Sequence, residues 1–123
     1  MTVIAESDSR SFQMHGSTFT SFVAPAGGST QLCAWRLDVV AGTPGVPHRV
    51  SHEEVLLVLG GELLVDLDGV ALRAHPGQTV FVPAGSQLAV AGGPGGARAW
   101  VTTSVGLTAT TGDGSVIAPP WTQ

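Results

Sequence analysis

Apolar and polar residues alternate with a period of two along several short stretches of the chain, which is typical of β-strands with one buried face. In residues 30–41 the alternation places Cys33, Trp35, Leu37 and Val39 on one face, which we expect to be interior. No window of a dozen residues shows a strong helical period. The expected strands, in chain order, are 17–24, 30–41, 54–59, 62–67, 79–82 and 98–105. The pattern therefore predicts an all-β protein.

Turn-forming residues separate these stretches. The chain contains 17 Gly and 8 Pro, above ordinary usage, and they are spread along its length. Gly60–Gly61 is predicted to form a hairpin and Asp68–Gly69 the next tight turn, because both pairs tolerate a positive φ. Residues 92–96 are expected to be a loop. The end of the chain, up to Trp121, is predicted to be extended because of its prolines.

Residues 54–59 are apolar on both faces. Leu56 and Val58 share one face, and Val55, Leu57 and Leu59 share the other. One face can fill the interior, but an exposed apolar strand face is an aggregation hazard. We therefore expect a second sheet or another subunit to cover the other face, and the protein to be a homodimer.

Composition excludes several classes of protein. Hydrophobic residues make up 43% and charged residues 11%, which excludes a disordered or coiled-coil chain. The net charge is −4 with no Lys, so nucleic acid is not an expected partner. No apolar run approaches 18 residues and no secretory signal is visible, so neither a membrane span nor export is expected. Cys33 has no partner for an intramolecular disulfide, which fits the cytoplasm.

The richest stretch in chemistry runs from Gly42 to Glu62. It places His48, His52, Glu53 and Glu54 in front of an apolar run, which suits a half-buried pocket with titratable groups at its mouth. Without Lys or Tyr, the acid–base groups available to the chain are four His, nine carboxylates and Cys33. Glu53 has the opposite parity to Glu54 and is expected to face solvent.

Two motifs in this region resemble those of the cupin family of small β-barrels. The first cupin motif reads G-x5-H-x-H-x3-4-E-x6-G, and Gly42, His48, Glu54 and Gly61 match it, with Val50 in place of the second His. The second motif reads G-x5-P-x-G-x2-H-x3-N. Its matches are Gly77, Pro83 and Gly85, with Leu88 in place of the His and Gly92 in place of the Asn.

The resemblance implies one cupin-like barrel, a jelly roll or double-stranded β-helix, that spans the single domain 1–123. The motif-bearing barrel would cover about 15–107, and 108–123 would be an extended tail. In cupins the three ligands of the first motif and the His of the second typically hold one divalent metal. Since Val50 and Leu88 are aliphatic, we expect no cofactor.

A rearranged metal site stays open as an alternative. Residues at i and i+2 on a strand lie on one face about 6.6 Å apart, so His52 and Glu54 form a possible ligand pair. His48 would join them only if the chain bends, because it lies roughly 13 Å from His52 in an extended strand. Three such ligands would suit a single Zn, Mn, Fe or Ni ion.

The resemblance leaves three functions open, all on small molecules. The first is a metal-independent enzyme for isomerisation, elimination, dehydration or cyclisation of a weakly polar substrate, with His48 as acid or base and Glu54 beside it to orient the imidazole. The second is a non-catalytic binding protein with the same pocket. The third is a metal-dependent oxygenase or isomerase with a reduced ligand set.

The side chains expected to contact the substrate are apolar, aromatic or near the motif histidines. They are His52, Val50, Leu88, Trp35, Cys33, Phe81 and Trp100. Core packing is an alternative for Cys33, Trp35 and Phe81. The alternation does not decide which way Trp100 faces, and Trp121 would pack over a barrel mouth or on a partner.

Overall fold

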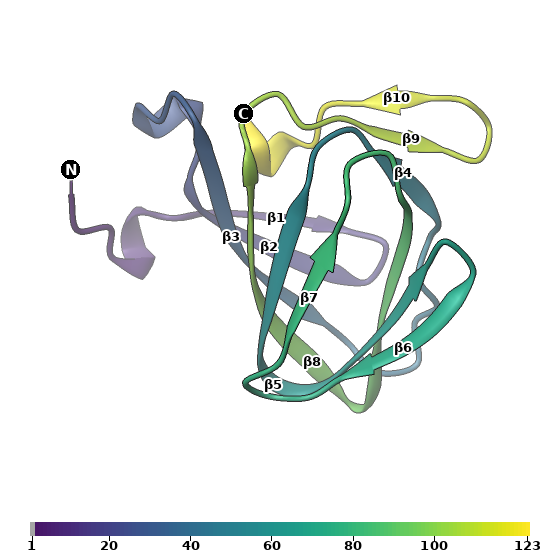
Figure 1. Ribbon diagram of the computed structural model, residues 1–123. Helices are drawn as coiled ribbons and strands as arrows, with labels where there is room; N and C mark the ends of the chain where they lie inside the picture. The colour runs from purple at the N-terminus through teal and green to yellow at the C-terminus, as the bar shows by residue number, and fades with distance from the viewer. Residues whose placement is uncertain (1) are drawn as a thin grey trace.

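The computed structural model describes residues 2–123, and these form one strongly curled β-sheet (Figure 1). The strands are β1 (Arg10–Met14), β2 (Ser17–Val23), β3 (Leu32–Val39), β4 (His48–Val50), β5 (Glu54–Leu67), β6 (Val70–Ala74), β7 (Thr79–Val82), β8 (Gln87–Ser104), β9 (Ala109–Thr111) and β10 (Val116–Ile117). Three single 3₁₀ turns accompany them: η1 (Glu6–Asp8), η2 (Pro25–Gly27) and η3 (Pro120–Thr122). The all-β prediction is confirmed. Across residues 2–123, every helix falls short of the length and apolarity needed to cross a bilayer.

The two longest strands, β5 and β8, hold the sheet together. They pair antiparallel along their whole length, from Glu54 opposite Thr103 to Leu67 opposite Leu88. The other edge of β8 pairs with β3 and, at its start, with β4, while the other edge of β5 pairs with β7 and β6. The hairpin β1–β2 continues from β3, and β9–β10 continues from β4. As a result the sheet curls around one interior (Figure 1).

The predicted hairpin at Gly60–Gly61 and the predicted loop at 92–96 are both wrong. Each segment lies inside a continuous strand, β5 or β8, and the register between the two strands shifts beside Gly60 and Gly61. Gly61 has a φ of +69°, and a Cβ there would overlap the carbonyl oxygen of Gly96 on β8. The glycines therefore let two paired strands bend at the same place, as β-bulges do.

Local turn chemistry is confirmed at Asp68–Gly69, which joins β5 to β6 with positive φ at both residues. The end of the chain differs from the expected extended tail. Residues 109–117 form the hairpin β9–β10, which pairs with β4 and lies at one end of the curled sheet with η3 (Figure 1). The sequence analysis also missed the short strands β1, β4 and β6, which have three to five residues each.

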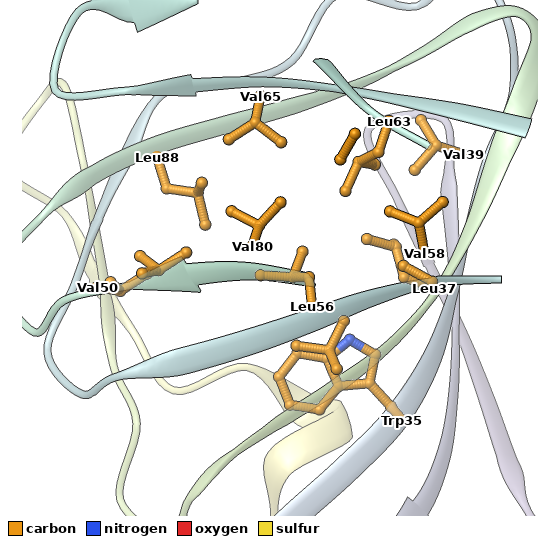
Figure 2. Packing of buried hydrophobic residues seen from close by; sticks show 14 of the residues in the cluster. Trp35, Leu37, Val39, Val50, Leu56, Val58, Leu63, Val65, Val80 and Leu88 are labelled. Atoms are coloured by element: carbon orange, nitrogen blue, oxygen red, sulfur yellow. The ribbon is translucent and has the colours of Figure 1, made fainter. Parts of the chain in front are cut away.

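The hydrophobic core fills the inside of the curl (Figure 2). Cys33, Trp35, Leu37 and Val39 of β3 are all buried, as the alternation predicted. They meet inward residues of the facing strands, namely Val50, Leu56, Val58, Leu63, Val65, Val80, Val82, Leu88, Ala99 and Val101. Burial of these side chains is the main force that closes the sheet on itself.

The outer face of β5 is apolar and exposed. Val55, Leu57 and Leu59 alternate with the buried Leu56 and keep 40%, 37% and 48% of their surface accessible. No other segment within residues 2–123 forms a second sheet over them. The expectation of a covering sheet within the chain is therefore not met, and a second subunit is left as the candidate cover.

Candidate functional site

A cavity of about 110 Å³ lies inside the curl. Its walls are mainly aliphatic and aromatic. Its titratable lining groups are Glu54, His48 and His15, and hydroxyl groups come from Ser17 and Thr111. An apolar hollow with a few polar groups is the usual form of a small-molecule site.

Glu54 is the most unusual group in this cavity. It is the first residue of β5, and strand alternation turns its side chain inward with Leu56, leaving 6% of it exposed. Within residues 2–123, no hydrogen bond or ion pair reaches its carboxyl group. Burial without a partner raises the pKa of Glu54 to about 7. The carboxyl group can therefore give or take a proton near neutral pH.

His48 supplies the second titratable group. It lies on β4, paired with Leu88 of β8, and is half-buried at the cavity wall. Its Nδ1 is 3.0 Å from the carbonyl oxygen of Val46. Because a carbonyl only accepts, Nδ1 carries the hydrogen, and in the neutral ring Nε2 holds a free lone pair. In this tautomer Nε2 is the nitrogen that can act as a general base.

The expected contact between these two groups is absent. His48 and Glu54 line the same cavity, but among the described residues no hydrogen bond or ion pair joins them. The carbonyl of Val46, and not Glu54, orients the imidazole. The sequence prediction of a Glu-oriented imidazole is therefore corrected: the two groups face one space from different strands.

Val50 and Leu88, the two motif positions without histidine, form part of the cavity wall. Val50 and Leu88 are 1% and 3% exposed and both line the cavity. The backbone brings the two motifs together here, because the N–H of Gly85 donates to the carbonyl of Val50 and the N–H of Val50 donates to the carbonyl of Ser86. The aliphatic residues therefore occupy the space where cupins have imidazoles.

The donors present do not fit a metal site. His52, the third ligand of the rearranged site, lies outside the cavity lining, and its Nδ1 is 2.7 Å from Oγ of Ser104. No three side chains of His, Cys, Asp or Glu within residues 2–123 gather where they could hold an ion. Among the described residues, His48, His52 and Glu54 are therefore not gathered as a shared ion would require.

Trp35 lines the cavity, but four other side chains expected to contact a substrate lie outside its lining: His52, described above, and Cys33, Phe81 and Trp100. Cys33 is fully buried in the core beside Thr122, whose carbonyl accepts from its Sγ at 3.5 Å, and burial raises the pKa of the thiol. Phe81 and Trp100 are on the outer face of the sheet. They pair with the outward residues Val55 and Leu57, so strand geometry turns them away from the cavity.

The sequence left open where Trp121 packs, and the structure places its ring at the cavity wall. Trp121 of η3 stacks on Phe19 of β2, with 3.6 Å between ring centroids, and meets Trp35 edge-on at 6.4 Å. The carbonyl of Trp121 accepts from Oγ of Ser21, which ties η3 to β2. His15, in the turn between β1 and β2, also lines the cavity. The one available signal was the proline pair before Trp121, which left open where that ring packs.

A curled β-sheet with both glycine-rich motifs at one apolar cavity defines a small cupin. The family model for the cupin domain matches residues 35–95, and the chain belongs to this family. No curated protein matches the chain.

Solved structures with the same fold are distant in sequence. The polyketide cyclase RemF from Streptomyces resistomycificus is 21% identical, with a TM-score of 0.73 over 85% of this chain and 79% of that one. An RmlC-like cupin from Shewanella frigidimarina is 23% identical, with a TM-score of 0.68 over 80% and 85%. Streptomyces PAC13 with uridine, a nucleoside dehydratase, is 16% identical, with a TM-score of 0.70 over 83% and 79%. These likenesses show the fold.

Proposed function

We propose that this protein is a metal-independent acid–base enzyme for a small, weakly polar organic substrate. One observation carries the proposal: a buried carboxyl group with a pKa of about 7 and an imidazole with an open Nε2 line the same apolar cavity. A base takes a proton best when it is neutral and positioned, and an acid gives one best when its pKa is near the working pH.

His48 acts as the base and Glu54 as the acid. Nε2 of His48 takes a proton from carbon or oxygen of the substrate, and the neutral form of Glu54 gives a proton to the atom that gains charge. Isomerisation, elimination, dehydration and cyclisation all need such a pair of transfers and no external oxidant. His48 and Glu54 line the same cavity with no hydrogen bond between them, so a substrate in the cavity can lose a proton to one and gain a proton from the other.

The named activities of two structural neighbours are consistent with this class of reaction. A cyclase and a dehydratase share the fold at 21% and 16% identity. Both names describe non-oxidative steps on organic molecules.

A proton-abstraction probe tests the proposal without the natural substrate. In 5-nitrobenzisoxazole a base removes the ring C–H proton, the N–O bond breaks, and a coloured cyanophenolate forms. We expect catalysed turnover by the parent protein and a loss of about 10²-fold or more in His48→Gln, the range typical of a positioned base. His52→Gln is the matched control, because His52 lies outside the cavity lining, and should stay within about twofold of the parent.

Two results would overturn the acid–base proposal. One is a parent protein no faster than the His48→Gln, Glu54→Gln double variant. The other is a His52→Gln variant that loses activity while His48→Gln keeps it. The first result would favour the non-catalytic binding protein.

We also propose that the working protein is a homodimer that buries the outer apolar face of β5. The support is the row of exposed apolar side chains at Val55, Leu57, Leu59 and Phe81, which one chain leaves uncovered.

A further inference from the structure

Two indole N–H groups beside the cavity have no hydrogen-bond partner. Trp35 and Trp121 are 3% and 7% exposed, both line the cavity, and Nε1 of each is buried without an acceptor within residues 2–123. Figure 2 shows the nitrogen of Trp35 on the side of the ring that faces Leu56, another lining residue. Native proteins pair more than 90% of such buried polar groups, so two unpaired donors at one cavity require an explanation.

Contact between the two rings cannot satisfy both donors. The rings meet edge-on, with 6.4 Å between centroids and 61° between planes. In an edge-to-face arrangement only the edge-on ring can point its N–H at the other ring, so at least one donor needs an oxygen from outside the protein. A bound water or a ligand would supply that oxygen.

The other cavity groups restrict the charge of such a ligand. No Lys exists in the chain, and none of the Arg side chains in residues 2–123 lines the cavity. An anion would therefore meet no Lys or Arg there and would face the carboxyl group of Glu54. The walls formed by Phe19, Trp35 and Trp121 offer aromatic surface, which favours a planar, apolar ring system.

We propose that the cavity binds a neutral, planar carbonyl compound whose oxygen accepts a hydrogen bond from the indole N–H of Trp35 or Trp121. This inference deepens the proposed function and rests on it for the choice of cavity. A donor at a carbonyl oxygen stabilises the negative charge that develops there when a neighbouring C–H proton leaves. The indoles would thus be substrate-positioning groups for proton removal by His48.

The third tryptophan, Trp100, is a control for this inference because it lies outside the cavity lining. The chain has three Trp, and Trp100 lies on the outer face, tilted against Phe22 at 5.3 Å between centroids. Three indole N–H signals in a ¹⁵N–¹H spectrum can therefore report on two cavity positions and one remote position. Single Trp→Phe variants assign the three signals.

Three probes of similar shape separate the chemical classes: 1-tetralone, tetralin and 1-naphthoate. We expect 1-tetralone to bind at least about tenfold more tightly than tetralin, because tetralin has no oxygen that could accept a hydrogen bond from the indole N–H. The ketone should move the indole proton of Trp35 or Trp121 downfield and leave Trp100 unchanged. The anion 1-naphthoate should bind more weakly than the ketone.

Equal affinity for tetralin and 1-tetralone would overturn the inference, as would tighter binding of 1-naphthoate, shifts confined to Trp100, or no binding of any probe. Trp35→Phe and Trp121→Phe extend the test: together they should abolish the preference for the ketone, and Trp100→Phe should keep it. If those variants do not fold, titration of the parent protein with the three probes still tests the inference. Binding of 1-tetralone without turnover of the benzisoxazole would contradict the proposed function alone. Turnover of the benzisoxazole without binding of 1-tetralone would contradict this inference alone.

Discussion

At the scale of single residues, the ionisation of Glu54 links the site to the stability of the fold. Burial raises the pKa of Glu54 from 4.5 to about 7, which corresponds to about 3 kcal/mol. Between these pH values the unfolded chain has lost the proton and the folded chain still binds it. The contribution of Glu54 to stability is therefore fully present below about pH 4.5 and is lost as the pH rises through about 7.

Glu54→Gln should remove this pH dependence, because an amide cannot ionise. Measured by urea unfolding, the stability of the variant relative to the parent should rise by about 3 kcal/mol from pH 4 to pH 8. Glu53→Gln is the matched control, since Glu53 is the exposed neighbour on the chain, and its pH profile should follow that of the parent. Parallel profiles for Glu54→Gln and the parent would contradict the assigned ionisation.

Val50 and Leu88 stand where the cupin motifs have histidines, and substitution can restore both imidazoles. Val50→His with Leu88→His would place two donors in the cavity wall beside His48 and Glu54. The double variant should bind zinc at least about tenfold more tightly than the parent, by about 1.4 kcal/mol or more, in a calorimetric titration.

Two further changes in that double variant show which ligands act. Adding His48→Ala should remove the gain in zinc affinity, and adding His52→Ala should not, because His52 lies outside the cavity lining. A folded double variant with the zinc affinity of the parent would mean that the two motifs are aligned wrongly.

At the scale of elements, the sequence predicted features that depend on neighbours along the chain. The buried face of β3 follows from the period of two, and the turn at Asp68–Gly69 follows from its residue types. Gly60–Gly61 was misread because a turn and a bulge both use glycine. The facing Gly96, far along the chain, decides between them by leaving no room for a Cβ on Gly61.

The same limit applies to the site. Motif spacing placed His48, Val50 and Leu88 at one cavity wall, since those positions depend on local strand geometry. Phe81 was misplaced because strands with two apolar faces do not reveal which face turns inward. Trp121 was left undecided because its contact with Phe19 depends on the path of the whole chain end.

The bend of β5 yields an element-scale prediction. Gly61→Ala should destabilise the protein by about 2 kcal/mol or more, because Ala is strained at a φ of +69° and its Cβ would overlap Gly96. Gly60→Ala is the neighbouring control: nothing lies within 4 Å of a Cβ at that position, and its φ is not in the left-handed region. Urea unfolding that gives both variants equal stability would contradict a specific role for the bend.

At the scale of the whole molecule, the sheet has two apolar surfaces, one buried and one exposed. The inner surface closes around the core and the cavity, while the outer surface of β5 and β7 stays open to solvent in the single chain. Phe81 on β7 is 52% exposed and pairs across the sheet with Val55 of β5, so the exposed side chains form one continuous row. A contiguous row of this kind favours contact with a second copy.

We expect light scattering at micromolar concentrations to give a mass of about 25 kDa, twice the 12.5 kDa of one chain. Leu57→Glu with Phe81→Glu should reduce it to one chain, because the charges would be buried without partners in the interface. Val116→Glu adds charge at a 64% exposed valine on β10, away from β5 and β7, and should leave the dimer intact. A parent protein that has the mass of one chain throughout this range would contradict the dimer and leave the row to a different partner.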